Sequence, residues 1–312
     1  TIHGTIGGGL VEAEAIRRAP PAIQERRAEV FDFDLQGSAF QGSDPVCGGL
    51  MRVLIAPLTP PSLQAYTAAA EARGQRERGV LLTRIQGTDR RTVEVEYVAE
   101  TTPPGDLRFP GLDAIRSVLK QETHGWFVSN PTAADAAVEV LVEPLVPCPR
   151  LLIVGGGHVG QAVAAQASVV DCEVTVLDDR PEFTAPDLFP EGVATRCGNI
   201  AQEVAGFPFS PDTCVVIVTR SHRCDAEALA ACLRQPAAYL GMIGSRRKVA
   251  LMRKDFIESG KATASEFERV YAPIGLDIGS VTVPEIAASI VAQLIAVRRT
   301  GQAQRIPRQR HG

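Results

Sequence analysis

Three glycines interrupt an apolar run near the middle of the chain, in the stretch LLIVGGGHVGQ (151–161). Gly155, Gly157 and Gly160 fit the pattern G-x-G-x-x-G between a predicted strand and a predicted helix. In this pattern the first glycine makes the turn, the second lets a phosphate approach the backbone, and the third lets the helix pack on the strand. Because a helix N-terminus attracts anions, the stretch predicts a phosphorylated ligand, faced by His158 in the first helical turn.

Asp178 ends the next predicted strand, about 20 residues after the glycine turn. A carboxylate in this place accepts hydrogen bonds from the ribose hydroxyls of a dinucleotide, which favours NAD. The neighbouring Arg180 would suit the additional phosphate of NADP. The same turn also serves other phosphorylated ligands, or packing alone, so the pattern leaves the ligand open.

The segment VTRSHRCD (218–225) follows another predicted strand and brings His222 and Asp225 to the same edge of the sheet. A histidine three residues before an aspartate indicates either a base with its orienting carboxylate or a pair of metal ligands. The alternative is that Asp225 caps the following helix and that His222 is a solvated loop residue.

The segment GMIGSRRKVA (241–250) forms the next predicted junction between a strand and a helix. It contains Gly244, Ser245, Arg246, Arg247 and Lys248. Cations at a helix N-terminus oppose the helix dipole, so helix stability does not explain them. An anion bound by the N–H groups and the guanidinium groups would explain them, and ordinary surface charge is the alternative.

The first half of the chain carries two more glycine-rich turns. Residues 7–9 are three glycines before a predicted helix with Glu12 in its early turns, and Cys47 precedes two glycines in PVCGGLMRV (45–53). A cysteine in such a turn is more exposed than one in a core, although a buried filler is the alternative. The seven cysteines form no C-x-x-C pair, so we expect no structural zinc site.

Prolines in LVEPLVPCPR (141–150) predict a break in regular structure and a domain boundary at about residue 147. Apolar runs that alternate with helical patterns in residues 148–312 predict a Rossmann-like, doubly wound parallel sheet. Residues 1–147 predict a smaller α+β domain. The predicted strands are 28–33, 50–58, 79–85, 91–100, 151–154, 173–178, 193–197, 214–219 and 238–243, and the predicted helices are 61–79, 158–170, 225–235, 246–260 and 284–299.

Composition narrows the classes of partner. The chain has 312 residues, 45% hydrophobic and 22% charged, and a net charge of −4, so it offers no sequence-wide basic field for nucleic acid or anionic lipid. No apolar run is long enough to span a membrane and no signal peptide opens the chain, which predicts a cytoplasmic protein. The chain begins at Thr1 inside a patterned segment, so we expect further native residues upstream.

Seven motifs, in order, resemble the XdhC/CoxI family of accessory factors for xanthine dehydrogenase, carbon monoxide dehydrogenase and related molybdenum hydroxylases. The resemblance runs from residue 4 to about residue 300. The motifs are TIGGGLVE, CGG, IVGGGHVGQA, DDRPEF, VTRSHRCDAEAL, YLGMIGSRRK, and APIGLDIG followed by VPEIAASIVAQL.

The resemblance implies a chaperone that binds the molybdenum cofactor, protects it while a cysteine desulfurase supplies its sulfido ligand, and delivers it to the apo-hydroxylase. Cys47 matches the cysteine of the CGG motif and is implied to contact molybdenum or its sulfur. The glycine turn with Asp178, the junction at Gly244, Ser245, Arg246 and Lys248, and the polar pair His222 and Asp225 match the remaining motifs. VTRSHRCD departs from other versions of its motif, which leaves the role of Cys224 open.

Two other functions remain open at this stage. One is an NAD(P)-dependent oxidoreductase that uses His222 and Asp225 as acid and base, and the other is a nucleotide-sensing module without catalysis. The long apolar C-terminal helix and the two-domain layout predict a homodimer.

Overall fold

The computed structural model describes residues 4–34, 50–87, 91–103, 105, 110–129 and 138–301. The chain divides into two compact units, Thr1–Pro147 (unit 1) and Cys148–Gly312 (unit 2). Each unit has its own hydrophobic core and is described by itself.

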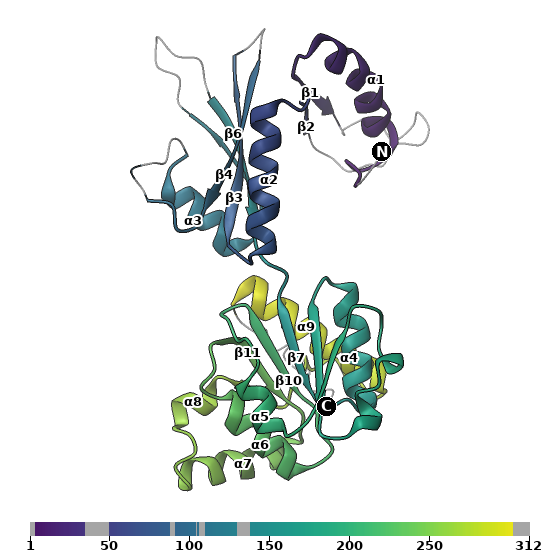
Figure 1. The fold of residues 1–312 in the computed structure, drawn as a ribbon, viewed down its shortest axis with the longest axis vertical. Coiled ribbons are helices and arrows are strands. Elements are labelled where there is room, and N and C mark those ends of the chain that lie inside the picture. Colours follow the sequence, from purple (N-terminus) through teal and green to yellow (C-terminus); the bar gives the residue numbers. More distant parts are fainter. Residues whose placement is uncertain are drawn as a thin grey trace, which may run out of the picture. The chain divides into compact units, whose positions relative to one another are not determined.

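Unit 1 is built on antiparallel strands, as predicted for an α+β domain (Figure 1). One strand pair packs against the first helix through Val11, Phe31 and Val53. A four-stranded sheet in the order β4-β3-β6-β5 packs its Val80, Val140 and neighbouring side chains against a helix. The elements are α1 (Gly9–Glu25), β1 (Glu29–Asp34), β2 (Leu50–Ile55), α2 (Pro60–Gly74), β3 (Gly79–Gln86), β4 (Thr92–Ala99), α3 (Leu112–Gln121), β5 (Gly125–Val128) and β6 (Val138–Leu145).

The predicted break at the prolines of 141–150 is wrong for Pro144. This residue lies inside β6, opposite Val80 of β3. The other neighbour of β6, the short strand β5, pairs only with residues 139–142. Past Val142 the strand therefore has one partner, and a residue without an N–H group is tolerated on the open side.

Unit 2 is a six-stranded parallel sheet in the order β12-β11-β10-β7-β8-β9, with helices on both faces (Figure 1). The strands are β7 (Arg150–Val154), β8 (Glu173–Asp178), β9 (Ala194–Cys197), β10 (Thr213–Ile217), β11 (Ala237–Met242) and β12 (Val270–Tyr271). The helices are α4 (His158–Val169), α5 (Ile200–Ala205), α6 (His222–Cys232), α7 (Arg246–Glu258), α8 (Ala264–Glu268) and α9 (Val283–Thr300), with short 3-10 turns at Pro181–Phe183 and Pro186–Leu188.

Successive residues of each central strand enter opposite cores. In β7, Leu151 and Ile153 pack with α4 and α9, whereas Leu152 and Val154 pack with α5, α6 and α7. Both faces of the sheet are therefore buried, which is why the strands are continuous apolar runs instead of alternating ones. The predicted Rossmann-like, doubly wound sheet is confirmed.

The strand order reverses between β7 and β10, because the chain leaves β7 toward β8 and β9 and then crosses back to β10. Ligands of such sheets bind at this switch point, outside the carboxyl ends of the strands. We call this side of unit 2 the carboxyl edge; it is formed by the segments that directly follow β7, β8, β10 and β11.

The last helix, predicted over 284–299, is α9, and it begins with a capping box. Thr282 accepts a hydrogen bond from the N–H of Glu285 at 3.4 Å, and the carboxylate of Glu285 accepts one from the N–H of Thr282 at 2.9 Å. Ile290, Leu294 and Val297 of this helix are buried against the sheet. Within the described residues, no helix is both long enough and apolar enough to cross a membrane.

The close approach of helix α4 to strand β7 depends on Gly160. A Cβ atom added there would overlap the carbonyl oxygen of Gly155, which is backbone and has no room to move, whereas a Cβ at Gly157 meets no atom within 4 Å. We expect Gly160→Ala to lower the free energy of unfolding by about 3 kcal/mol, and Gly157→Ala by less than about 1 kcal/mol. Urea denaturation measures both. Equal losses would contradict this packing role.

Candidate functional site

The glycine turn after β7 uses its glycines for different purposes. Gly155 has φ +118°, and a Cβ there would lie 2.5 Å from the carbonyl oxygen of Val218 in the segment after β10. Gly156 leaves no room for a Cβ because the carbonyl of Phe183 lies against it. Gly157, in contrast, faces open space and is the residue that precedes helix α4. A ligand can therefore approach the backbone closely at Gly157.

The N-terminus of α4 lacks a side-chain cap, unlike α6 after β10 and α7 after β11. Ser221 caps α6 by accepting from the N–H of Cys224 at 3.2 Å, and Ser245 caps α7 by accepting from the N–H of Lys248 at 3.2 Å. Gly157 has no side chain with which to cap α4. The first N–H groups of a helix have no partner inside the helix, so this end of α4 is suited to an anion. His158, the first residue of α4, is exposed there, and its contact with a ligand stays a prediction.

Asp178 has intramolecular partners for both carboxylate oxygens. One oxygen accepts from the N–H of Arg180 at 3.1 Å and from its Nε at 2.9 Å. The other accepts from the N–H of Gly156 at 2.9 Å and from Nη2 of Arg180 at 3.2 Å. Asp178 thus ties the end of β8 to the glycine turn, instead of presenting a vacant acceptor to a ribose.

The pKa of Asp178 reflects two opposing influences. Burial of the side chain raises the pKa. Hydrogen bonds from Arg180 and from the N–H of Gly156, together with the positive charge of Arg180, lower it by more than burial raises it, so the pKa of Asp178 lies below the ordinary value. The carboxylate therefore remains ionised and paired at neutral pH.

A second aspartate–arginine pair lies beside the first. Arg220, in the segment after β10, donates from both terminal nitrogens to the carboxylate of Asp179, at 2.8 and 2.9 Å. Between the two pairs a cavity of about 10 Å³ remains. It is lined by Gly155, Asp178, Asp179, Arg180, Ile200, Thr219, Arg220 and Cys224. Buried Cys224 is therefore a wall of this cavity.

Asp225 does not orient His222. The Asp225 side chain is fully buried and accepts from the N–H of Thr219 at 3.1 Å, from the hydroxyl of Thr219 at 2.5 Å, and from Nζ of Lys248. His222 is the exposed first residue of α6. Among the described residues, no hydrogen bond joins the two side chains, so the predicted acid–base pair is not formed. Asp225 instead couples the junction after β10 to the junction after β11.

The three cations at the start of α7, Arg246, Arg247 and Lys248, have different environments. Lys248 is half-buried and paired with Asp225, whereas Arg246 and Arg247 are exposed and form no ion pair within the described part of the chain. Gly244 lies against the side chain of Lys248, where a Cβ would be 3.2 Å from a carbon of that side chain. Lys248 is therefore structural, and Arg246 and Arg247 are the cations available to a ligand.

Cys47 lies outside the described residues, so its role stays a prediction. The structure does place Met51, which follows the CGG motif at the start of β2, near the first glycine turn. A Cβ built at Gly7 would lie 4.0 Å from the Met51 side chain. Gly7, Gly8 and Gly9 all have positive φ, which explains why glycine is repeated before α1.

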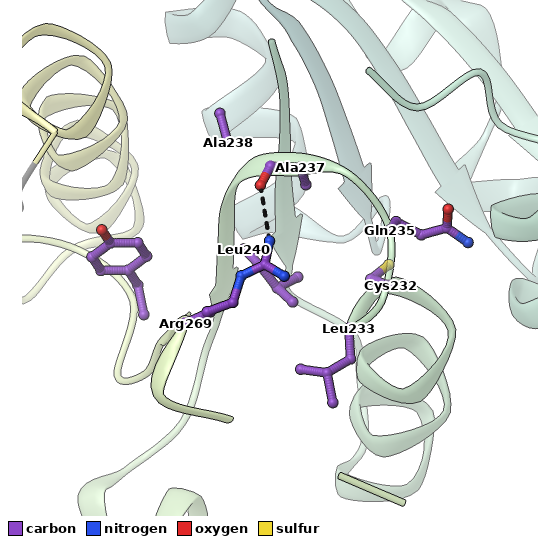
Figure 2. Close-up of a pocket in the computed structure, with 8 residues that line it drawn as sticks. Cys232, Leu233, Gln235, Ala237, Ala238, Leu240 and Arg269 are labelled. Carbon is purple, nitrogen blue, oxygen red and sulfur yellow. Dashed lines mark hydrogen bonds between the residues drawn. The ribbon is translucent and has the colours of Figure 1, made fainter. Parts of the chain in front are cut away.

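A larger hollow of about 190 Å³ lies at the opposite edge of the sheet, near the amino ends of β11 and β12 (Figure 2). The guanidinium of Arg269 donates there to the carbonyl oxygen of Ala237 at 3.3 Å. None of the predicted site residues lines this hollow. Across the described residues, no three His, Cys, Asp or Glu side chains gather in a way that would hold a metal ion.

Sequence reasoning missed several residues of the carboxyl edge. Gly156, Phe183 and Thr219 contact the predicted residues directly, and the Arg220–Asp179 pair covers the cavity. In the sequence, Gly156 belongs to the glycine turn, Asp179 and Phe183 to the motif DDRPEF, and Thr219 and Arg220 to VTRSH. The sequence does not show which side chains of these segments turn inward.

The fold and the glycine turn define unit 2 as a Rossmann-type domain. Residues 151–294, most of unit 2, match the XdhC Rossmann domain.

Two curated relatives extend the comparison. A protein of Bacillus subtilis (strain 168) that is named as a probable xanthine dehydrogenase subunit is 29% identical over 298 residues, which cover 95% of this chain and 84% of the relative. The uncharacterized protein YqeB of Escherichia coli (strain K12) is 34% identical over 195 residues, which cover 60% of this chain. The match covers 35% of the length of YqeB.

A solved structure shares the fold over nearly the whole chain. The crystal structure of a xanthine dehydrogenase from Bacillus halodurans aligns with a TM-score of 0.74 at 22% identity, covering 96% of this chain and 84% of that one. At this identity the likeness establishes the fold alone.

The buried pair of Asp225 and Lys248 leads to a stability prediction. We expect Asp225→Asn to lower the free energy of unfolding by about 3 kcal/mol, because Lys248 and the Thr219 N–H lose a buried anionic partner. His222→Ala should cost less than about 0.5 kcal/mol because His222 is exposed. Urea denaturation at neutral pH compares the two. A similar loss in both variants would indicate that the residues act as a pair after all.

The lowered pKa of Asp178 leads to a pH prediction. Its ordinary pKa is about 3.9, so the stability that it contributes is present at and above this pH and is lost as the pH falls through the lower folded-state pKa. We expect Asp178→Asn to be less stable than the wild type at pH ~7, and the difference to shrink below pH ~4. Urea denaturation across this range measures it. A difference that stays constant with pH would contradict the ionised pair.

Proposed function

We propose that this chain is an accessory factor of a xanthine dehydrogenase-type molybdenum hydroxylase that carries the molybdenum cofactor as cargo. In this role it protects the cofactor during sulfuration and delivers it to the apo-hydroxylase. The observation that carries the proposal is the alignment of 95% of the chain with a relative named for xanthine dehydrogenase, together with the XdhC match of unit 2.

The carboxyl edge of unit 2 supports a phosphorylated cargo. Molybdopterin ends in a phosphate group, and the uncapped N-terminus of α4 at Gly157 provides N–H groups in open space. Arg246 and Arg247 are exposed at the neighbouring junction and form no ion pair among the described residues. Guanidinium groups bind phosphate with two parallel hydrogen bonds, so either arginine suits this end of the cargo.

Cys47, which lies outside the described residues, is the candidate contact of molybdenum or its sulfur that the family resemblance implies. A thiolate is a soft donor suited to molybdenum or to sulfur exchange. The desulfurase that provides the sulfur and the apo-hydroxylase that receives the cofactor are the expected partners. A homodimer remains a prediction from the sequence.

The NAD(P)-dependent oxidoreductase is less well supported. It needs an acid–base pair, but the buried Asp225 is bound to Thr219 and Lys248 and not to His222. It also needs a ribose acceptor, and both oxygens of Asp178 are occupied.

Purification from a host that makes the molybdenum cofactor tests the proposal. We expect oxidised extracts of the purified protein to show pterin fluorescence, because the cofactor is retained as cargo. Arg246→Ala should lower retention about tenfold, the effect of losing roughly 1.4 kcal/mol of phosphate binding. Arg269→Ala, at the opposite edge of the sheet, is the matched control and should retain the pterin. Protein without pterin that reduces NAD(P) with a small substrate would contradict the proposal.

The same assay addresses Cys47. Cys47→Ser should fold normally and lose pterin, whereas Cys172→Ser, which removes a half-buried thiol of unit 2, should keep it. If Cys47→Ser retained as much pterin as the wild type, Cys47 would be a packing residue and not a contact of the cofactor.

A further inference from the structure

The acceptor capacity of Asp178 is fully used inside unit 2. A carboxylate has about four positions at which its oxygens accept hydrogen bonds. Asp178 accepts three hydrogen bonds from Arg180 and one from the N–H of Gly156. Its side chain is 5% exposed. A ribose diol, which a Rossmann site normally binds through this carboxylate, finds no free acceptor.

Arg180 is fixed in this position from a second side. Its guanidinium lies 3.8 Å from the centre of the Phe183 ring, in a cation–π contact. Phe183 is itself held against the glycine turn, since its carbonyl lies where a Cβ of Gly156 would be. Moving Arg180 away from Asp178 would therefore break its bonds to the carboxylate and its contact with Phe183 together.

We propose that the Asp178–Arg180 pair excludes a ribose diol from the end of β8. Unit 2 then selects a ligand that places a phosphate on the glycine turn and carries no nucleoside at Asp178. This inference rests on the proposed function and specifies the form of the cargo. It is the phosphomonoester form of the cofactor, molybdopterin, and not a dinucleotide form whose nucleoside would occupy this position.

Titration with NAD⁺ tests the pair directly, because NAD⁺ carries the diol that Asp178 would bind. By calorimetry we expect the wild type not to bind NAD⁺ at about 1 mM, the limit of weak specific binding. Arg180→Ala removes the two hydrogen bonds from the guanidinium but keeps the one from the backbone N–H, so it frees two acceptor positions of Asp178 and should gain affinity at least about tenfold. Arg180→Lys, which keeps a cation beside Asp178, and Arg269→Ala, which removes an arginine at the opposite edge, should both resemble the wild type.

Two results would overturn the inference. One is NAD⁺ binding by the wild type that Arg180→Ala weakens, because Arg180 would then be a contact of the nucleotide. The other is an Arg180→Ala protein that is folded by thermal denaturation but still does not bind NAD⁺, because the pair would then not be the excluding element.

Analysis of the bound cargo gives a second measurement that needs no variant. Acid hydrolysis of pterin-loaded wild type should release no stoichiometric CMP, GMP or AMP. Pterin with an equimolar nucleotide would overturn the inference and leave the carrier function supported. Protein without any pterin would instead contradict the carrier function, and the NAD⁺ titration would still decide the role of Asp178 and Arg180.

Discussion

The hydrogen bond between the Gly156 N–H and the carboxylate of Asp178 holds the carboxyl edge together. It joins the segments that follow two neighbouring strands, and it fixes the turn from which α4 begins. In this turn Gly155 has a positive φ, and Gly160 packs on the carbonyl of Gly155. The open backbone at Gly157 is thus a consequence of a tightly occupied backbone on either side of it. The other junctions are joined by the same kind of contact, since Asp225 links Thr219 to Lys248.

Most of the fold of unit 2 was predictable because two properties of the sequence agree. Apolar runs of strand length alternate with helical patterns, and turn glycines and capping residues such as Thr282 and Glu285 mark the boundaries. Unit 1 was less predictable. Strand β5 has four residues, too few for a periodic pattern. Pro144 made β6 hard to predict, because a proline is tolerated in this strand only beyond the point where β5 stops pairing with it. The helical spacing of Ile115, Val118 and Leu119 is a usable signal for α3, although no helix was predicted there.

The site was predictable in its location but not in its contacts. The ends of parallel strands meet at one edge, so Gly155, Asp178, Asp225 and Lys248 had to gather there. Spacing does not show that Asp225 turns inward while His222 stays exposed, since both positions lie in the first turn of α6. Nor does it show that Arg180, two residues beyond Asp178, folds back on it. These directions are decided by tertiary packing.

The carboxyl edge neutralises much of its own charge. Arg180, Arg220 and Lys248 are each bound to an aspartate, so their fields are short-ranged. Among the described residues, Arg246 and Arg247 are then the cations of this edge that no carboxylate neutralises. The attraction that an approaching anion feels is therefore concentrated at the start of α7, away from the two aspartate–arginine pairs.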